Sequence, residues 1–464
     1  MSNETVRSTD VKLGFGRQLG YGLGEFAGQF FFGFWGSYLS IFYTDQVGLA
    51  PGIVSMIFLI ARIWDAINDP MFGNIADRHK PHKKWGRYRP WILFGAPSLA
   101  VLGILVWRVP NLDSNGAKIA YVAITYILAG MAFTAVNVPY MSLQATLTTD
   151  MKSRGDIANI KGAFTFVGTS VVNLFTMGLV TKLGGGEPNA RGYFLTGVVF
   201  TLIGLVLYFI TFASTKEEYI VEQQLEKVPL KDMAAYLFGN KPMLAVMFTL
   251  LLSMLATFGR LGVAVYYYMY CCHAFDKIGL LMVIPTLCTI LPTYLIPKLN
   301  VSRKKLIMIA LIGRAVALFV LSRIDYTNIT AIIICLVFVG LMNFETGMLA
   351  GLIAPAIDDA EVKKGIRMDG TAYAVVNLFA KAASAVGGAI GLAVMGAMGY
   401  VANAEQSATA LTGINIAANI LPAIFCIAAI IPLIMYRLTP EKIAENSRIL
   451  AERHAKEHAA DAAE

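Results

Sequence analysis

The segment from Arg62 to Pro70 places one arginine, one asparagine and two aspartates inside an apolar run that extends over residues 53–73. Arg62, Asp65 and Asp69 are spaced by three and four positions, so a helix aligns them on one face. Ionisable groups at membrane depth are costly and mark ion or substrate pathways by default. We therefore predict an oxygen-rich site that suits Na⁺ or a proton. The alternative is an internal Arg–Asp pair that joins two helices, but one arginine cannot neutralise two aspartates.

The composition indicates an integral membrane protein. Of the 464 residues, 56% are hydrophobic and 15% are charged, and the mean hydropathy is +0.61, whereas soluble domains carry about 25% charged residues. Apolar runs of about 20 residues recur along the chain, which predicts helices rather than a barrel. The five cysteines show neither a paired framework nor a metal-ligand spacing, so we expect them to be packing residues.

The net charge of +8 is explained by topology rather than by a nucleic-acid partner. Lysine and arginine gather in alternate loops, above all in residues 78–89, whereas residues 45–50 and 402–410 contain neither. Cytoplasmic loops of membrane proteins carry this excess of positive charge. We therefore predict a multi-pass protein of the cell inner membrane with both termini in the cytoplasm.

Turn signals and charge divide the sequence into twelve predicted spans. The spans are 19–44, 51–75, 90–108, 118–147, 159–181, 192–214, 242–271, 277–297, 305–322, 327–354, 370–400 and 411–436. A long polar interval separates six from six, a layout typical of two parallel halves around a central cavity. The predicted domains are an N-terminal six-helix half over 1–213, a cytoplasmic connector over 214–241, a C-terminal six-helix half over 242–438, and a cytoplasmic tail over 439–464 whose helix frays into solvent.

Several motifs resemble a known family. The pattern Gly-x-x-x-Asp-Arg over residues 73–78 is similar to the helix-two loop signature of the major facilitator superfamily. Phe-Tyr-Thr-Asp at 42–45, Ala-Arg-Ile-Trp-Asp-Ala-Ile-Asn-Asp-Pro at 61–70, Trp-Gly-Arg-Tyr-Arg-Pro-Trp at 85–91 and Gly-Ile-Arg-Met-Asp-Gly-Thr-Ala-Tyr at 365–373 resemble the glycoside–pentoside–hexuronide:cation symporters, typified by melibiose permease. This resemblance covers nearly the whole chain. It implies the twelve-helix major facilitator fold, cation coupling and sugar substrates.

The resemblance implies a cation site on the second span. Asp65, Asn68 and Asp69 match the family's site there, and Thr134 matches the hydroxyl that completes it. Asn68 and Thr134 supply neutral oxygens that a bare proton does not require, so we favour Na⁺ over H⁺, with Asp65 and Asp69 as its anionic ligands and no organic cofactor.

Two basic residues are assigned to coupling. Lys381 matches the lysine that the family sets near the acidic pair, and Arg62 lies beside that pair in sequence. Two carboxylates that face one ammonium leave one negative charge for a cation to neutralise. The alternative for Lys381 is a snorkelling side chain at a helix end, but it lies about ten residues into its span.

The predicted sugar site departs from the melibiose pattern. Gln29 and Asn137 stand where the galactoside carriers place aspartates, and Met141 replaces a tryptophan, which argues against melibiose itself. Glu25 matches an acidic position common in the branch that handles glucuronides and pentosides. Amide side chains can still bind sugar hydroxyls, so we keep Glu25, Gln29, Asn137 and Met141, together with Lys381, as candidate substrate-binding residues.

Two further charges lie within apolar spans, Arg260 in span seven and Glu345 in span ten. Arg260 could dock an anionic sugar such as a glucuronide, because a guanidinium binds a carboxylate in bidentate fashion. The alternative is an Arg260–Glu345 pair that joins two helices, which would leave a neutral pentoside or hexoside as substrate. Tyrosines 266–268 could stack on a sugar or simply pack.

A third group of charges lies in the predicted cytoplasmic loops. We expect it to form salt bridges between the halves that hold one state of the transport cycle. A solvated loop without this role is the alternative, and Pro355 stands where the family's motif has an aspartate. The predicted gate residues are Asp77, Arg78, Asp358, Asp359, Glu361, Arg367 and Asp369.

These features together predict a secondary active cation:sugar symporter that works as a monomer by alternating access. Its partners are a small sugar or glycoside, a coupling cation and membrane lipid. A sensor on the same fold would be expected to lose the two aspartates, and a lysolipid carrier would need an apolar cavity. An integral-membrane enzyme would need a constellation that the five histidines do not provide, namely His79, His82, His273, His454 and His458.

Overall fold

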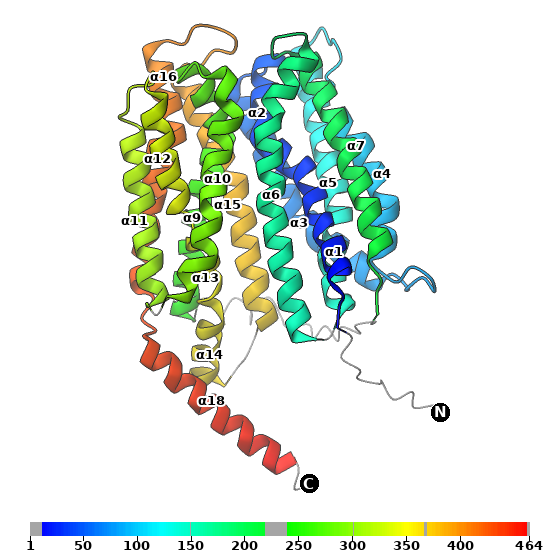
Figure 1. The fold of residues 1–464 in the computed structure, drawn as a ribbon, viewed down its shortest axis with the longest axis vertical. Coiled ribbons are helices and arrows are strands. Elements are labelled where there is room, and N and C mark those ends of the chain that lie inside the picture. The colour runs from blue at the N-terminus through cyan, green and yellow to red at the C-terminus, as the bar shows by residue number, and fades with distance from the viewer. Residues whose placement is uncertain (1–11, 149, 219–238, 300, 366–368, 462–464) are drawn as a thin grey trace. The chain divides into compact units, whose positions relative to one another are not determined.

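The computed structural model describes residues 12–148, 150–218, 239–299, 301–365 and 369–461, and in these ranges the regular elements are all helices (Figure 1). The chain divides into two compact units. The first comprises Met1–Gln224 and Phe275–Val283, and the second comprises Leu225–Ala274 and Ile284–Glu464. Most of the predicted connector lies outside the described residues, so the predicted domain boundaries stay predictions.

Nine helical segments of the described chain are long and apolar enough to cross a membrane. The all-α membrane class is therefore confirmed, whereas the count of twelve spans stays a prediction. Of the remaining predicted spans, the third corresponds to an apolar helix of shorter length, Arg89–Leu105.

The helices of the first unit are mostly long, and two short π-helical turns interrupt its first span. In chain order they are α1 (Phe15–Gly28), η1 (Gln29–Gly33), α2 (Phe34–Ile41), η2 (Phe42–Gln46), α3 (Pro51–Arg78), α4 (Arg89–Leu105), α5 (Asn115–Leu147), α6 (Met151–Gly184) and α7 (Ala190–Ser214). The 3₁₀ turn η4 (Phe275–Lys277) and the start of α10 (Ile278–Leu295) also belong to this unit.

Glycines let α1 approach its neighbours closely. A Cβ on Gly24 would lie 2.4 Å from the ring of Tyr140 on α5, and a Cβ on Gly22 would lie 2.5 Å from the ring of Phe164 on α6. The rings of Tyr21 and Tyr140 stack at 4.6 Å, and the Tyr140 hydroxyl donates to the Tyr21 carbonyl at 2.8 Å. Small residues at such crossings are the usual basis of close helix packing in membranes.

The second unit contains more helix breaks than the first. In chain order its elements are α9 (Lys241–Tyr266), η3 (Tyr267–Cys271), the rest of α10, η5 (Ile296–Lys298), α11 (Arg303–Leu321), α12 (Ile329–Leu341), α13 (Glu345–Ala350), α14 (Ile353–Lys364), α15 (Asp369–Ala397), α16 (Ala408–Asn415), η6 (Ile416–Ile420), α17 (Leu421–Met435) and α18 (Pro440–Asp461). The close packing of α9 on α15 again uses glycines, because a Cβ on Gly387 would lie 2.9 Å from the backbone nitrogen of Gly259.

The predicted tenth span, 327–354, is not one continuous helix. It breaks after α12 and again after α13, and side chains of neighbouring segments bind the carbonyls near both breaks. Thr289 Oγ donates to the Gly340 carbonyl at 3.0 Å, and Arg303 Nη1 donates to the Gly351 carbonyl at 2.7 Å. Irregular backbone at membrane depth is tolerated where protein satisfies it in this way.

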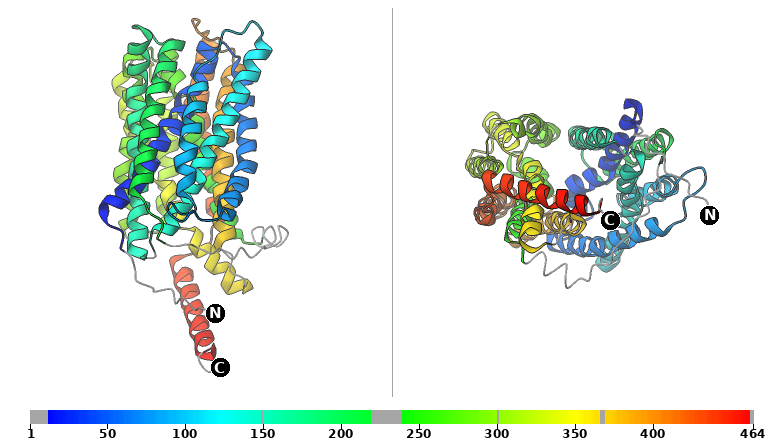
Figure 2. Two further views of the ribbon diagram at one scale, coloured as in Figure 1. Left: turned by 90° about the vertical axis from the view of Figure 1, so that its right-hand side faces the viewer. Right: turned by 90° about the horizontal axis from the view of Figure 1, so that it is seen from below.

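The C-terminal helix α18 packs against α14 rather than fraying into solvent as expected (Figures 1 and 2). Asn446 and Leu450 of α18 are buried, and Asn446 Nδ2 donates to Asp359 Oδ1 at 3.2 Å. Arg453 donates to the Val362 carbonyl at 3.2 Å near the end of α14. Docking of the first part of the tail was not predicted, and it arises because the charged, alanine-rich helix still buries Asn446 and Leu450.

Candidate functional site

The two aspartates of α3 lie one helical turn apart and face α5. Arg62 Nη1 donates to Asp65 Oδ2 at 3.2 Å, and Thr134 Oγ donates to Asp69 Oδ1 at 2.7 Å. A Cβ on Gly130 would lie 3.3 Å from Asp65 Oδ1, so the small residue one turn before Thr134 lets that carboxylate approach α5. Each carboxylate therefore meets one turn of the neighbouring helix.

Asn68 lies between these aspartates in the sequence and is fully buried. Neither its Nδ2 nor its Oδ1 has a hydrogen-bond partner in the described part of the chain. A buried amide that stays unpaired costs about 1–3 kcal/mol for each polar group. Such a cost is explained most simply by a ligand that the amide binds.

Arg62 is positioned by an aromatic ring as well as by its carboxylate partner. Its guanidinium lies 4.9 Å from the ring centroid of Phe32, and the side chains of Arg62 and Asp65 are 21% and 20% exposed. The pair is thus open enough to exchange partners. The structure brings Arg62, Asp65, Asp69 and Thr134 together on facing turns of α3 and α5, but their binding of a cation, and the part of Asn68 in it, stay predictions.

The oxygen set fits a hard cation. Two carboxylates, one unpaired amide and one hydroxyl lie on adjacent turns, and carboxylate and amide oxygens are the ligands that hard cations prefer. Asp65, Asn68, Asp69 and Thr134 would hold the ion. The bound ion would supply positive charge to the two carboxylates, of which Arg62 compensates only Asp65.

The predicted sugar-site residues Glu25 and Gln29 form a polar chain between α1 and α6. Gln29 Nε2 donates to Glu25 Oε1 at 3.3 Å, Thr169 Oγ donates to Gln29 Oε1 at 3.1 Å, and Lys161 Nζ pairs with Glu25 Oε2 at 3.7 Å. Gln29 opens the π-helical turn η1, where the extra residue per turn changes the direction in which side chains point. Such turns are often found at functional sites. A Cβ on Gly168 would lie 2.7 Å from Gln29, so a glycine makes room for this amide.

Sequence reasoning missed Lys161 and Thr169. The fifth span was predicted to start at residue 159, which would place Lys161 at a membrane surface, but the corresponding helix α6 starts at Met151. Lys161 also lies 6.0 Å above the ring of Tyr140. The signal that could have found it is the same one that identified Arg62, namely a charge inside an apolar helix.

Asn137 and Met141 lie one turn apart on α5, and Asn137 Nδ2 contacts Met141 Sδ at 3.8 Å. Asn137 is half-buried and Met141 is 50% exposed. Asn137 follows Thr134 by three residues, so one face of α5 carries both the hydroxyl that contacts Asp69 and the amide assigned to sugar. This helix therefore links the two predicted sites.

In the second unit, the alternative pairing of Arg260 with Glu345 is wrong. Glu345 Oε1 pairs with Arg314 Nη1 of α11 at 2.6 Å, whereas Arg260 Nη2 donates to the Tyr268 hydroxyl at 2.8 Å. Arg314 is closer to Glu345 because α13 packs against α11 after the break in span ten. Sequence reasoning missed Arg314, although it lies mid-way along an apolar span.

Arg260 lies in a different environment from Arg314. No described carboxylate lies within ion-pair distance of Arg260, and its Nε is buried without a hydrogen-bond partner among the described residues. Of tyrosines 266–268, Tyr268 holds the Arg260 guanidinium, while Tyr266 packs edge-on against Tyr400. Lys381 lies mid-helix in α15 with an exposed side chain. It belongs to the second unit, so its approach to the acidic pair of α3 stays a prediction.

The predicted gate residues of the first unit lie at the end of α3. The Tyr88 hydroxyl donates to Asp77 Oδ1 at 2.8 Å, and Arg78 is exposed. Burial of Tyr88, reinforced by the bond to Asp77, raises the pKa of Tyr88 to about 12. The hydroxyl is therefore a permanent donor at physiological pH and ties Asp77 to the loop before α4.

That loop is anchored by a carboxylate that sequence reasoning did not identify. Glu217 accepts hydrogen bonds from the backbone N–H groups of Arg87, Tyr88 and Arg89 at 2.9, 2.8 and 3.0 Å. Free N–H groups at a helix start favour an anion in this position. Glu217 therefore fixes the Trp-Gly-Arg-Tyr-Arg-Pro motif at the start of α4.

The predicted gate residues of α14 contact α18 as well as their own helix. Asp359 Oδ2 pairs with Lys363 Nζ at 2.6 Å, in addition to its bond from Asn446, and the Glu361 carbonyl accepts from Arg453 at 3.4 Å. Asp358 is half-buried on α14 and Asp369 opens α15. Arg367 lies outside the described residues. Salt bridges between the halves stay a prediction.

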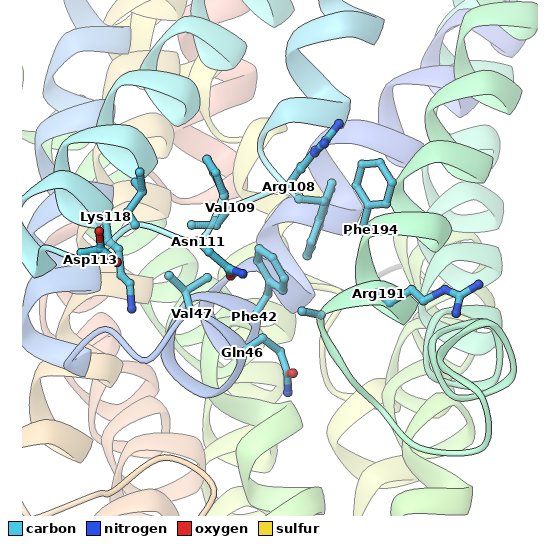
Figure 3. A pocket seen from close by; sticks show the side chains of 14 residues that line it. Phe42, Gln46, Val47, Arg108, Val109, Asn111, Asp113, Lys118, Arg191 and Phe194 are labelled. Atoms are coloured by element: carbon cyan, nitrogen blue, oxygen red, sulfur yellow. The ribbon is translucent and has the colours of Figure 1, made fainter.

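A separate pocket of about 360 Å³ lies in the first unit where η2 ends and α5 and α7 begin (Figure 3). Figure 3 shows Phe42 and Asn111 near its centre, whereas the guanidinium of Arg191 points away. None of the predicted site residues lines this pocket. It is therefore not the predicted sugar site.

Helical architecture and intramembrane polar sites together define a multi-pass transporter. A family model described as MFS/sugar transport protein matches residues 20–440. An isoprimeverose transporter of Lactiplantibacillus pentosus is 31% identical over 95% of this chain and 92% of its own length. A glucuronide carrier protein homolog of Escherichia coli (strain K12) is 27% identical and covers 92% of this chain and 93% of its own.

A solved structure shares the fold. The crystal structure of a D-xylose-proton symporter superposes with a TM-score of 0.64 at 15% identity, covering 92% of this chain and 98% of the other. This chain therefore belongs to the MFS/sugar transport protein family of the major facilitator superfamily, and its resemblance to the glycoside–pentoside–hexuronide:cation symporters is confirmed. It is a transporter and not an enzyme.

Proposed function

We propose that this protein is a secondary active symporter that couples inward movement of a sugar or glycoside to a cation bound on α3. The observation that carries the proposal is the pair of carboxylates one turn apart on α3, because Asp65 lies against Gly130 of α5 and Asp69 accepts from the Thr134 hydroxyl at 2.7 Å. Family membership supports transport of a sugar, and the printed names of two relatives are an isoprimeverose transporter and a glucuronide carrier homolog.

Na⁺ is the coupling ion that we propose. A proton needs one basic oxygen, whereas the α3 site offers several neutral and anionic oxygens on adjacent turns, as a metal cation requires. Binding of the cation raises sugar affinity, and sugar raises cation affinity by the same factor, because the linkage is reciprocal. Sugar uptake that ignores Na⁺ but collapses with a protonophore would reverse the assignment to H⁺.

The proposed substrate class is a glycoside, with an anionic sugar such as a glucuronide preferred. Arg260 has no carboxylate partner among the described residues, and Lys161 pairs with Glu25 at 3.7 Å, a distance long enough for a substrate carboxylate to compete. A neutral pentoside or hexoside is the alternative, in which case Glu25, Gln29 and Asn137 bind hydroxyls. Met141 lies one turn after Asn137 on the same helix, α5, and would border the bound sugar.

The proposed architecture is twelve transmembrane helices in two six-helix halves that rock about a central site. The two compact units support this arrangement, and α4, although short, is apolar. We also propose that the protein works as a monomer in the cell inner membrane. Both termini then lie in the cytoplasm, because the basic loops at residues 78–89 and 303–305 are cytoplasmic by the distribution of positive charge.

Replacing each carboxylate tests the proposed cation site. Asp65→Cys and Asp69→Cys should each abolish uphill accumulation, because removing one charge destroys the balance that cation binding at low dielectric needs. Sugar exchange down its gradient should survive. The measurement is uptake of a p-nitrophenyl glucuronide and of the matching glucoside and xyloside into proteoliposomes, with and without a Na⁺ gradient. Normal uphill uptake by either variant contradicts the assignment.

A further inference from the structure

The first unit has a groove between α4 and α5, beside the residue that follows α3. The volume of this α4–α5 groove is about 340 Å³, and it is lined by His79, Pro90, Trp91, Phe94, Gly95, Ser98, Ala132 and Ala135. Helix α4 packs along α5 (Figure 1). None of the lining residues belongs to the proposed cation site, the sugar site or the gate. The transport function therefore does not explain what occupies this groove.

Small side chains create the α4–α5 groove. On α5 it is lined by Ala132 and Ala135, which are three residues apart and so share one face of the helix. On α4 it is lined by Gly95 and Ser98, which have the same spacing. A Cβ on Gly95 would lie 2.8 Å from the Val136 side chain, so the two helices approach closely here. The short side chains in front of this crossing leave the space open.

Aromatic side chains border the groove on the side of the loop that joins α3 to α4. Phe94 is 62% exposed, and its ring centroid lies 5.9 Å from that of Trp85 in the loop. The ring of Trp91 lies edge-on to that of His79, with the centroids 6.3 Å apart. Tryptophan is enriched where a membrane meets water, at the level of the lipid head groups. The aromatic border therefore places this end of the groove at head-group depth.

The lining of the groove suits a hydrocarbon chain rather than a sugar. None of the lining residues is an acid, a lysine or an arginine, and their polar side-chain groups are the Ser98 hydroxyl, the Trp91 indole N–H and the His79 ring. Most hydroxyls of a sugar in this groove would lose their hydrogen bonds to water without replacement, which is costly. A hydrocarbon chain has no such cost.

The loop of residues 78–89 beside this end of the groove is strongly basic. It contains six lysines and arginines and no acidic residue. The four that are exposed form no ion pair with another described residue, and they are Arg78, Lys80, Lys83 and Lys84. Exposed positive charge thus lies next to the aromatic border of an apolar groove.

Two carboxylates contact this loop, and both are engaged by groups other than the four exposed cations. Asp77 accepts from the Tyr88 hydroxyl, and Glu217 accepts from three consecutive backbone N–H groups at the start of α4. These bonds hold the loop in place. Its charge is therefore fixed beside the groove and remains available to an anion.

We propose that the α4–α5 groove is a binding site for one anionic phospholipid. An acyl chain would lie in the groove against Ala132 and Ala135, and the phosphate of the head group would lie at the basic loop, near Lys80. Basic clusters beside membrane helices attract anionic head groups in this way. The apolar groove supplies the chain site and the loop supplies the charge, so the two features together select a lipid over a free anion. The site goes beyond the proposed symport function and needs neither sugar nor coupling ion.

Fluorescence quenching tests the proposal on the full-length protein in detergent. The probe is phosphatidylglycerol with brominated acyl chains, because bromine quenches a tryptophan that the chain contacts. We expect saturable quenching in wild type, and brominated phosphatidylcholine should need about tenfold higher concentrations, because its head group has no net charge. Most of this quenching should be absent in Trp91→Phe. Equal titrations for the two lipids, or unchanged quenching in Trp91→Phe, would overturn the proposal.

A second variant fills the groove. Ala132→Phe should lower the affinity for brominated phosphatidylglycerol about tenfold, since losing the burial of about two methylene groups has an effect of that size. Ala120→Phe is the matched control, because Ala120 is exposed on the same helix twelve residues earlier and does not line the groove. The control should bind as wild type does. Wild-type affinity in Ala132→Phe would place the lipid elsewhere and contradict the proposal.

A third variant removes charge from exposed positions, where folding is not at risk. The double variant Lys80→Gln with Lys84→Gln should lose most of the preference for phosphatidylglycerol over phosphatidylcholine. Lys118→Gln with Lys182→Gln is its control, because these lysines lie at the start of α5 and in the last turn of α6. The control should keep the preference. A preference that survives in the Lys80 and Lys84 variant means that the loop does not hold the head group, and the proposal fails.

A competition experiment distinguishes a lipid from a free phosphate. Glycerol 3-phosphate at millimolar concentration should leave the quenching by brominated phosphatidylglycerol unchanged, because it has no acyl chain. Loss of quenching would show a site for small anions and overturn the lipid assignment. These titrations contain no glycoside and no ion gradient, so their result is independent of whether the protein proves to be a cation-coupled sugar symporter.

Discussion

Among the described membrane helices, two arginine–carboxylate pairs differ in their sequence separation, their distance and their exposure. Arg62 and Asp65 lie on one continuous helix, are 3.2 Å apart and are each about one-fifth exposed, with a second aspartate one turn away. Arg314 and Glu345 lie on different helices, are 2.6 Å apart and are sealed from solvent. An open pair with surplus negative charge can exchange a partner for an incoming ion. A sealed pair of opposite charges has no surplus charge and joins two helices instead.

The backbone explains this difference. On α3, regular helical spacing places all charges on one face, so their proximity needs no other element. Glu345 is brought to Arg314 by a break in span ten, where the helix ends at Leu341 and restarts at Glu345. The first pair is therefore a local feature and the second is a tertiary one. Substitutions at both pairs and outside them test how far this contrast extends.

Removing the arginine of the sealed pair should have the largest effect. Arg314→Met leaves Glu345 buried without its cationic partner, which typically costs 3–5 kcal/mol, so we expect about that loss of stability. Arg62→Met should cost less, because Asp65 is one-fifth exposed whereas Glu345 is completely buried. Thermal unfolding in one detergent compares the two variants. The double variant Arg314→Met with Glu345→Met should recover most of the loss, and equal destabilisation by the two single variants would refute the contrast.

Removing the hydroxyl at the open site should change cation affinity rather than stability. Thr134→Val deletes the donor to Asp69 and one neutral oxygen, so the Na⁺ concentration for half-maximal uptake should rise about tenfold, the equivalent of roughly 1.4 kcal/mol. Thr125→Val is the matched control, since the Thr125 hydroxyl bonds to the Tyr121 carbonyl of the same helix at 2.7 Å. An unchanged Na⁺ dependence in Thr134→Val would remove Thr134 from the site.

Replacing Arg260 should have a smaller effect, which concerns the preference for an anionic over a neutral sugar. Arg260→Gln should lower uptake of a glucuronide relative to its neutral glucoside by about fivefold to tenfold, because a charge-assisted hydrogen bond contributes a little over 1 kcal/mol beyond a neutral one. Tyr268→Phe, which removes the hydroxyl that holds Arg260 Nη2, should change the ratio less. A ratio that stays constant in Arg260→Gln makes Arg260 structural and ends the argument for an anionic sugar.

A substitution outside both charge sites should have the smallest effect. Tyr88→Phe removes the hydrogen bond to Asp77 and should lower stability by about 1 kcal/mol. Because the pKa of Tyr88 is raised above its ordinary value to about 12, its contribution is fully present below about pH 10 and is lost only as pH rises through about 12. Thermal unfolding of both proteins at pH 6 to pH 9 should therefore show a constant difference. A difference that varies across this range would contradict the assigned bond.

Much of the fold followed from hydropathy and family motifs. The helical membrane class was predicted because every spanning segment must satisfy its own backbone, which leaves a strong apolar signal of helix length. The breaks in span ten were not predicted, because 327–354 is predominantly apolar and its freed carbonyls are satisfied by Thr289 and Arg303 from other parts of the chain. The docking of α18 was missed for the same reason, since its partner α14 is distant in sequence.

The sequence by itself determined the α3 site, because a helical repeat alone aligns Arg62, Asp65 and Asp69. Motif resemblance also predicted that Thr134 lies beside these aspartates, and its hydroxyl contacts Asp69. Only the tertiary structure decided which charges pair in the rest of the membrane region. In it, Glu345 pairs with Arg314 rather than with Arg260, and Lys161 pairs with Glu25. The physical reason is that pairing between helices depends on helix starts, breaks and crossing contacts, and these are set by packing among distant segments rather than by spacing along the chain.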